Sequence, residues 1–147
     1  MSELHVLNPE QFPHCFVCGP NNPDGLHLVV YREGDEAVAS YTPRPTHEGY
    51  PERFHGGLVG LLVDEMLVYA GAAQDLWGMT AKVSYSLRAH IPMDAELSLR
   101  SRLTRAGSRG YRATVEIRFA DGTLAAEGEG MCVISQDLAP AEQEATA

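Results

Sequence analysis

The sequence lacks the features that mark membrane-spanning, disulfide-rich or nucleic-acid-binding proteins. No apolar run reaches the ~18 residues that a membrane-spanning helix needs. Residues 1–12 have no basic segment followed by an apolar one, so we expect no signal peptide, a cytoplasmic location and no membrane partner. The three cysteines are an odd number, which argues against a disulfide framework. The net charge of -9 argues against nucleic acid as a partner.

The composition that is present suits one globular domain. The chain has 147 residues, of which 44% are hydrophobic and 21% charged, and these values are typical of a folded domain with its own core. We expect a single domain over residues 1–135, in which residues 1–25 form an N-terminal helix and loop. The helix is predicted from Asn8 as its cap and Pro9 at its first position. The polar, alanine-rich residues 136–147 are predicted to form a disordered tail.

One apolar segment stands apart from the β-type patterns around it. Residues 58–73 are apolar on every side except at Asp64 and Glu65. At about 16 residues, this segment is too long for a strand and too short for a membrane span, so it predicts a helix buried on all faces. Alternating or β-rich patterns predict strands over residues 26–33, 36–42, 80–91, 96–107, 111–120 and 123–134.

These elements predict an α+β fold. The first two strands flank Gly34-Asp35 and form a hairpin. The last four, with hairpin turns at Gly107-Ser108 and Asp121-Gly122, form an antiparallel meander. An antiparallel sheet with one solvated face must cover its other face. Because only one long helix is available, we expect the sheet to wrap around it.

The two acids in the predicted helix indicate a functional site, because an unpaired carboxylate in apolar surroundings is costly. The alternative is that they point to solvent at a sheet edge, and this alternative is stronger for Glu65 than for Asp64. Gly57 and Asp64 lie on nearly the same helix face, whereas Glu65 is rotated away by about 100°. The free N–H groups at the helix start favour an oxyanion. Gly56 and Gly57 lack side chains, so a substrate carbonyl can approach those groups closely.

The spacing along the helix separates Asp64 from a carbonyl bound at its own helix start. Seven residues of helix put Asp64 roughly 10 Å from Gly57 along the axis, whereas a general base acts over about 3 Å or through one water. A second copy related by a two-fold axis could bring its Asp64 to that carbonyl. We therefore expect two equivalent sites at a homodimer interface.

Three stretches of the sequence, taken in order, resemble a known family. The His-Gly-Gly motif at 55–57, followed by Asp64, resembles the active-site helix of PaaI-like hot-dog-fold thioesterases. Residues 79–92 resemble the strand after this helix in the family. Residues 15–28 resemble the N-terminal segment of a subgroup that includes the human thioesterase superfamily members. The match extends over residues 15–134.

The resemblance implies a hot-dog fold with an antiparallel sheet of five to six strands around one long central helix. It also implies homodimers, which in part of the family pair into homotetramers, and hydrolysis of an acyl-CoA thioester. By position, the N–H of Gly57 polarises the carbonyl, His55 shapes the helix entry, and Asp64 of the partner subunit activates water or attacks directly. Thr80 would lie near the acyl group, and Arg88 could face the CoA phosphates. The expected substrate-binding residues are Gly56, Thr80, Lys82 and Arg88.

Two further features bear on substrate binding. Many family members carry Asn or Gln shortly before His-Gly-Gly, where this chain has His47 and Glu48, so these two are accessory candidates together with Glu65. Residues 82–118 hold eight basic and three acidic residues in an otherwise acidic chain. Two interpretations of this excess stay open: a solvated strand face, or a patch for a small polyanion such as the CoA phosphates.

The Cys15-x-x-Cys18 pair is the remaining motif. Such a pair could begin a zinc site, but a second pair of ligands is needed, and only scattered residues such as His27 and Cys132 could help. We therefore interpret the pair as part of a structural loop and expect neither a metal nor a cofactor. Cys132, in an apolar strand, is predicted to be a small buried hydrophobe.

Acyl-CoA hydrolysis is the leading functional hypothesis, and two alternatives remain beside it. An enoyl-CoA hydratase or dehydratase on the same fold would need a histidine and an acid to converge, and His55 or His47 with Asp64 would serve. A non-catalytic acyl-CoA-binding module would need no acid at all.

Overall fold

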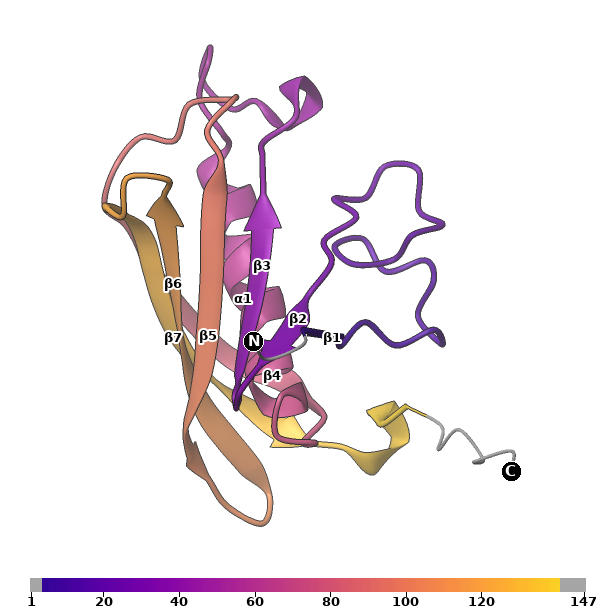
Figure 1. Ribbon diagram of the computed structural model, residues 1–147. Coiled ribbons are helices and arrows are strands. Elements are labelled where there is room, and N and C mark those ends of the chain that lie inside the picture. Colours follow the sequence, from indigo (N-terminus) through magenta and orange to yellow (C-terminus); the bar gives the residue numbers. More distant parts are fainter. Residues whose placement is uncertain (1–3, 141–147) are drawn as a thin grey trace.

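The computed structural model describes residues 4–140, which form one antiparallel sheet curved around one α-helix (Figure 1). The helix, α1, spans Gly56–Ala72. The strands are β1 (His5–Val6), β2 (Tyr31–Glu33), β3 (Glu36–Tyr41), β4 (Gly78–Leu87), β5 (Leu97–Ala106), β6 (Gly110–Phe119) and β7 (Leu124–Ile134). The predicted α+β fold, with the sheet wrapped around a single helix, is confirmed. The described part of the sheet has seven strands, because the short β1 and β2 extend the edge beside β3.

The order of strands across the sheet is β1-β2-β3-β5-β6-β7-β4. The β2–β3 hairpin and the β5–β6–β7 meander agree with the prediction. The prediction that β4 also belongs to this meander was wrong, because β4 pairs with β7 and lies at the opposite end of the sheet from β1. The connection from β4 to β5, residues 88–96, contains Pro92 and is too long for a tight hairpin, so the chain crosses to the other side of the meander.

The sheet surrounds α1 so closely that most of the helix is buried. Leu62, Val63, Met66 and Leu67 have no exposed surface, as expected for a helix that is apolar on nearly all sides. The predicted bounds, 58–73, agree with the observed ones within two residues. One face of the helix is partly or fully exposed, and we call it the accessible stripe: Gly57, Leu61, Asp64 and Val68.

Strand β4 is an edge strand that exposes apolar side chains. Met79 and Leu87 are 60% and 53% exposed, and Val83 and Tyr85 about 40%. The strand also touches the helix closely, because a Cβ atom at Gly60 would lie 2.5 Å from the ring of Tyr85. An unpaired strand edge with exposed apolar side chains is a surface that another chain can cover.

The N-terminal segment contradicts one prediction. Residues 7–30 contain turns but no helix, so the predicted helix start at Asn8 was wrong. The Asn8 side chain instead accepts a 2.7 Å hydrogen bond from the Val30 N–H and donates a 2.8 Å bond to the Leu28 carbonyl. The Asn8 side chain thus pairs with backbone groups that a neighbouring strand would otherwise satisfy. Because the side chain makes these bonds, it does not cap a helix.

The C-terminal residues differ in part from the predicted tail. Gln136–Leu138 form a 3-10 turn. The Gln11 side chain donates to the carbonyls of Leu138 and Ala139, at 3.4 and 3.0 Å. The prediction of disorder is therefore wrong for residues 136–140. The rest of the predicted tail, residues 141–147, lies outside the described residues.

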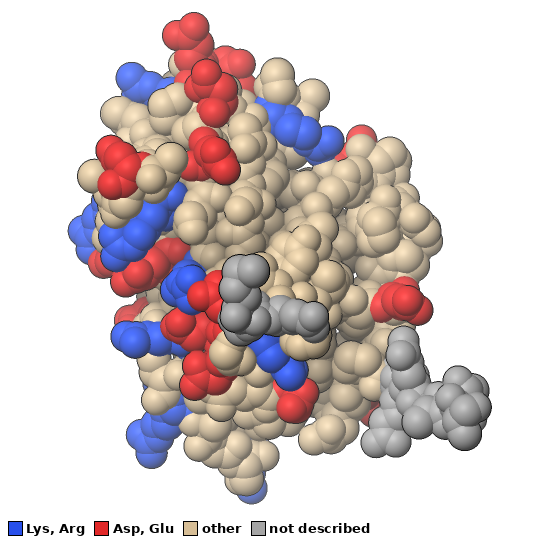
Figure 2. All heavy atoms as spheres, viewed as in Figure 1, with Lys and Arg blue, Asp and Glu red and all other residues tan. Residues whose placement is uncertain are grey.

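Two arginines of the arginine-rich strands form ion pairs on the solvated side of the sheet. Arg100 binds Glu33 and Glu36 at 3.2 and 3.0 Å, and Arg118 binds Glu116 at 3.0 Å. Figure 2 shows basic and acidic side chains interleaved over the side of the molecule formed by these strands. This arrangement favours the solvated-face interpretation of the basic excess. No helix among residues 4–140 is long and apolar enough to cross a membrane.

Candidate active site

The start of α1 is held in place by two backbone hydrogen bonds from the residues that precede it. Phe54 N–H donates to the Ile91 carbonyl at 2.8 Å, and His55 N–H donates to the His47 carbonyl at 3.1 Å. His55 is the N-cap residue, with φ -62° and ψ 127°. Its Nδ1 atom accepts a 2.9 Å hydrogen bond from Gly57 N–H. His55 therefore shapes the helix entry, as the resemblance implied, and it does so by satisfying one of the four free N–H groups.

The hydrogen bond from Gly57 to His55 revises the expected donor. Gly57 N–H already has a partner, whereas Gly56 N–H has none among residues 4–140. Gly56 is the first residue of α1, so its N–H lies at the positive end of the helix dipole. At the start of α1, the expected donor Gly57 N–H is thus bonded to His55, and Gly56 N–H is the group left without a partner among residues 4–140.

Gly56 opens into a cavity of about 850 Å³. The cavity lies between the segment that leads into α1 and the segment that follows β4, so each side is fixed by one end of a regular element. Among the predicted residues, Glu48, His55, Gly56, Gly57 and Arg88 line it. The other lining residues are Gly49, Tyr50, Arg53, Phe54, Val59, Leu87, Ala89, His90 and Ile91.

Asp64 is partly exposed on the accessible stripe and does not line this cavity. The part of the chain that the structure describes provides no hydrogen-bond or ion-pair partner for its carboxylate. Asp64 therefore lies outside the cavity that Gly56 of the same chain lines.

The accessory candidates have separate environments. His47 is buried, and its Nδ1 lies 2.7 Å from the hydroxyl of Tyr41. Burial, followed by the nearby Arg44 charge, lowers the pKa of His47 below its usual value. His47 does not line the cavity, and its contact with Tyr41 lies in the segment that leads to α1. Glu48 does line the cavity, but its Oε1 accepts a 3.1 Å bond from Glu52 N–H.

Glu65 points away from this cavity. Its Oε1 lies 3.8 Å from the sulfur of Cys15, in the N-terminal segment. Burial is the main cause that raises the pKa of Glu65 to about 7. A hydrogen bond with Cys18 is the main cause that lowers the pKa of Cys15 to about 5. Glu65 therefore belongs to a second cluster of polar groups, together with Cys15 and Cys18.

The expected substrate-binding residues on β4 do not reach the cavity. Thr80 is partly buried with its hydroxyl 3.8 Å from the sulfur of Cys132, and Lys82 is exposed. Arg88 lines the cavity but binds Glu127 at 2.7 Å, with both side chains about half exposed. Such a surface pair is weak, so Arg88 stays available to an anion. Cys132 is 1% exposed, as predicted for a small buried hydrophobe.

Sequence reasoning missed two residues that line the cavity and one that contacts the start of α1. Arg53 and Tyr50 line it from the segment before the helix. Tyr85, on β4, donates a 3.2 Å hydrogen bond to the Gly56 carbonyl, which fixes the first turn of α1 against the strand. The signal available for Arg53 and Tyr50 was their position in the irregular segment just before His-Gly-Gly.

Comparison with known proteins gives matches among solved structures alone, because no family model and no curated protein matches the sequence. A thioesterase superfamily protein aligns with a TM-score of 0.77 and 30% identity, over 82% of this chain and 60% of that one. This chain therefore spans less than two thirds of that relative. PaaI, from the E. coli phenylacetic acid degradation operon, aligns with a TM-score of 0.69 and 17% identity, over 75% and 80% of the two chains. A hypothetical thioesterase protein from Streptococcus pneumoniae, solved with coenzyme A, aligns with a TM-score of 0.66 and 17% identity, over 74% and 85%.

These likenesses confirm the resemblance drawn from the motifs. The chain has the hot-dog fold, and it is similar to thioesterase superfamily structures, PaaI among them.

Proposed function

We propose that the chain is an acyl-CoA thioesterase whose active site is shared between two subunits of a homodimer. Gly56 N–H of one subunit binds the thioester carbonyl, and Asp64 of the partner subunit activates water. The observation that carries this proposal is the Gly56 N–H, which begins a buried helix, opens into an 850 Å³ cavity and has no hydrogen-bond partner among residues 4–140.

Two exposed features of the molecule support the proposed dimer. The free edge of β4 exposes Met79, Val83, Tyr85 and Leu87, and the accessible stripe of α1 runs beside it. A second copy that covers this edge would bury apolar surface and remove an unpaired edge. Under a two-fold axis the contact is reciprocal, so each Asp64 can face the helix start of the other subunit.

Hydrolysis then proceeds through an anionic tetrahedral intermediate. Asp64 of the partner subunit accepts a proton from water, and the water oxygen bonds to the carbonyl carbon. The negative charge that forms on the carbonyl oxygen is stabilised by Gly56 N–H and the helix dipole. The carbon–sulfur bond then breaks, and the CoA thiolate leaves and takes up the proton. Backbone donors are well suited to this step because they are fixed before the charge develops.

Coenzyme A as the leaving group is supported by charge at the cavity. Arg53 and Arg88 stand on its two sides, and neither is held by a buried ion pair. Guanidinium groups bind phosphate oxygens through paired hydrogen bonds. The pneumococcal hot-dog protein was solved with coenzyme A, which is consistent with such a ligand on this fold.

A thiol-release screen over short, long, aromatic and hydroxylated acyl-CoAs tests the proposed activity. We expect release of CoA from at least one class, and its loss by about 100-fold or more in Asp64→Asn. Asp35→Asn, in the exposed β2–β3 turn, is the matched control and keeps wild-type rates. Loss of enoyl-CoA absorbance with no thiol release would show hydration instead. A rise in melting temperature with acyl-CoA, but no turnover, would show a binding module.

A further inference from the structure

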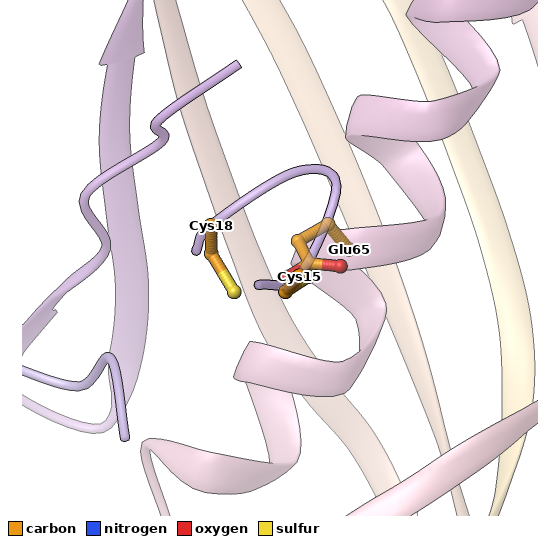
Figure 3. Close-up of side chains that lie close together, drawn as sticks. All are labelled: Cys15, Cys18 and Glu65. Carbon is orange, nitrogen blue, oxygen red and sulfur yellow. Dashed lines mark hydrogen bonds between the residues drawn. The ribbon is translucent and has the colours of Figure 1, made fainter. Parts of the chain in front are cut away.

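The N-terminal segment, residues 7–30, is unusually long for a segment with no helix or strand of its own. Its middle part and α1 line one pocket, to which the helix contributes Glu65, Val68 and Tyr69. Figure 3 shows Cys15 and Cys18 on a tight loop of this segment, with Glu65 of α1 extending toward them. The loop and the helix are distant in sequence. The contact between them therefore depends on the side chains of these three residues.

The three side chains have the spacing of metal ligands. The sulfurs of Cys15 and Cys18 and a carboxylate oxygen of Glu65 all lie within 4.8 Å of one another, and the Cys15 sulfur is 3.8 Å from Glu65 Oε1. Tetrahedral zinc with Zn–S of about 2.3 Å and Zn–O of about 2.1 Å places its ligand atoms roughly 3.6–3.8 Å apart. A small contraction of the cluster would therefore complete such a geometry.

The turn from Cys15 to Gly19 is closed by the backbone. Gly19 N–H donates to the Cys15 carbonyl at 2.9 Å. A Cβ atom at Gly19 would collide with the backbone of Cys15, so the turn requires glycine there. This turn keeps the sulfurs of Cys15 and Cys18 near each other.

The charge at the cluster is not balanced by the protein. No Lys or Arg among residues 4–140 forms an ion pair with Glu65, and Asp64, also acidic, is its neighbour in sequence. A carboxylate in such surroundings is stabilised by a cation or by neutralisation. Two adjacent sulfurs make a soft divalent ion, zinc above all, the best match.

The cluster also faces an open space. A largely apolar pocket of about 430 Å³ is lined by all three residues, together with Phe12, Tyr69 and Trp77. A metal held by the three side chains would have its fourth coordination position directed to this pocket. Three protein ligands with one open position differ from the closed four-ligand sites of purely structural zinc.

We propose that Cys15, Cys18 and Glu65 bind one Zn²⁺ per chain, with the fourth position open to this pocket. The ion fastens the N-terminal segment to α1. Its binding forms two Zn–S bonds and one Zn–O bond, and the thiol protons pass to solvent without any change of oxidation state. The expectation of no metal, drawn from the sequence, therefore gives way to this proposal.

Metal binding by the full chain tests the proposal without reference to acyl-CoA turnover. The purified protein is stripped with a chelator, reduced, and titrated with Zn²⁺ or Co²⁺. We expect one ion per chain, a thiolate-to-cobalt charge-transfer band, a higher melting temperature with Zn²⁺, and zinc–sulfur distances near 2.3 Å by X-ray absorption. Mutation of a residue that only hydrogen-bonds to a metal ligand typically lowers metal affinity by about 10- to 100-fold. Replacement of a ligand itself, in Cys15→Ser, Cys18→Ser or Glu65→Gln, should therefore lower zinc affinity by at least about 100-fold.

Two controls make the outcome specific. Cys132→Ser removes the third thiol, and Asp64→Asn removes the neighbouring acid, and both should bind zinc as the wild type does. Circular dichroism of each variant separates lost folding from lost binding. The proposal is overturned if the reduced wild type binds no zinc, or if it binds zinc equally well without Cys18. Full zinc affinity in Glu65→Gln would also contradict it. So would a Cys15–Cys18 disulfide that stays metal-free after treatment with a reductant and Zn²⁺.

Discussion

His55 Nδ1 accepts a 2.9 Å hydrogen bond from Gly57 N–H, and among residues 4–140 Gly56 N–H is left without a partner at the start of α1. Gly57 N–H stabilises the helix entry, while Gly56 lines the cavity. Gly56 N–H is the proposed catalytic donor because His55 already accepts the hydrogen bond of Gly57 N–H.

Replacement of Gly56 by proline removes this one N–H with little other change. Proline suits the first position of a helix, and the extended backbone of His55, with ψ 127°, tolerates a following proline. We predict that Gly56→Pro lowers kcat for thiol release by about 100- to 1000-fold while the melting temperature stays near that of the wild type. Gly56→Ala has the same new contact with Leu87 but keeps the N–H, so it should retain most activity. Equal rates in the two variants would exclude Gly56 as the donor.

Disruption of the β4 edge should separate the subunits. A lysine at Val83 places a charge on the exposed apolar edge that the proposed partner covers. We predict that Val83→Lys is monomeric by light scattering and has lost thioesterase activity, because each monomer lacks the second half of its sites. Val6→Lys, on β1 at the opposite edge of the sheet, is the control and stays dimeric and active. An active Val83→Lys monomer would show that one chain suffices.

Recognition of the CoA phosphates should depend on Arg53. Arg53 lines the cavity, and among residues 4–140 its guanidinium has one hydrogen-bond partner, His90 Nε2, at 3.4 Å. We predict that Arg53→Gln raises KM for acyl-CoA about tenfold, equivalent to ~1.4 kcal/mol, with kcat nearly unchanged. The KM for the matching acyl-pantetheine, which lacks the nucleotide phosphates, should stay the same. Arg105→Gln, on the exposed end of β5, provides the control, and a similar KM change with both substrates would argue against phosphate binding.

The stability of the fold should depend on pH through His47. Burial lowers its pKa in the folded state, so the unfolded chain takes up a proton first as the pH falls below about 6.5. This contribution to stability is present above pH 6.5 and is lost as the pH drops toward the folded pKa. His47→Asn keeps an acceptor for the Tyr41 hydroxyl but does not titrate. We therefore predict a shallower decline of the unfolding free energy between about pH 7 and 5 in this variant; an unchanged slope would assign the effect to other groups.

The helix and strands could be predicted from the sequence more accurately than the pairing of the strands in the sheet. Residues 58–73 formed the helix within two residues because an all-apolar run of that length has few alternatives. The order of the strands was less accessible, since period-two patterns identify a strand and its buried face but not its neighbour. Strand β4 was therefore assigned to the wrong edge, although Pro92 and the long connection after the strand were visible in the sequence.

The site was predictable to the extent that it is local. The distance of Asp64 from the helix start follows from helix geometry alone. The occupation of Gly57 N–H was not foreseen, because histidine is not among the usual N-cap residues. The cluster of Cys15, Cys18 and Glu65 joins a loop to a helix far along the chain, and no local pattern reveals such a contact.

Subunit complementation tests the shared active site most directly. Gly56→Pro and Asp64→Asn are each inactive as homodimers, and they are mixed in equal amounts, dissociated and allowed to reassociate. Half of the dimers are then hybrids, and in each hybrid one site combines an intact Gly56 with an intact Asp64 of the partner subunit. The mixture should recover about a quarter of wild-type thiol release. If both groups served one site within a single chain, every site would keep one defect, and the mixture would remain as inactive as the two variants alone.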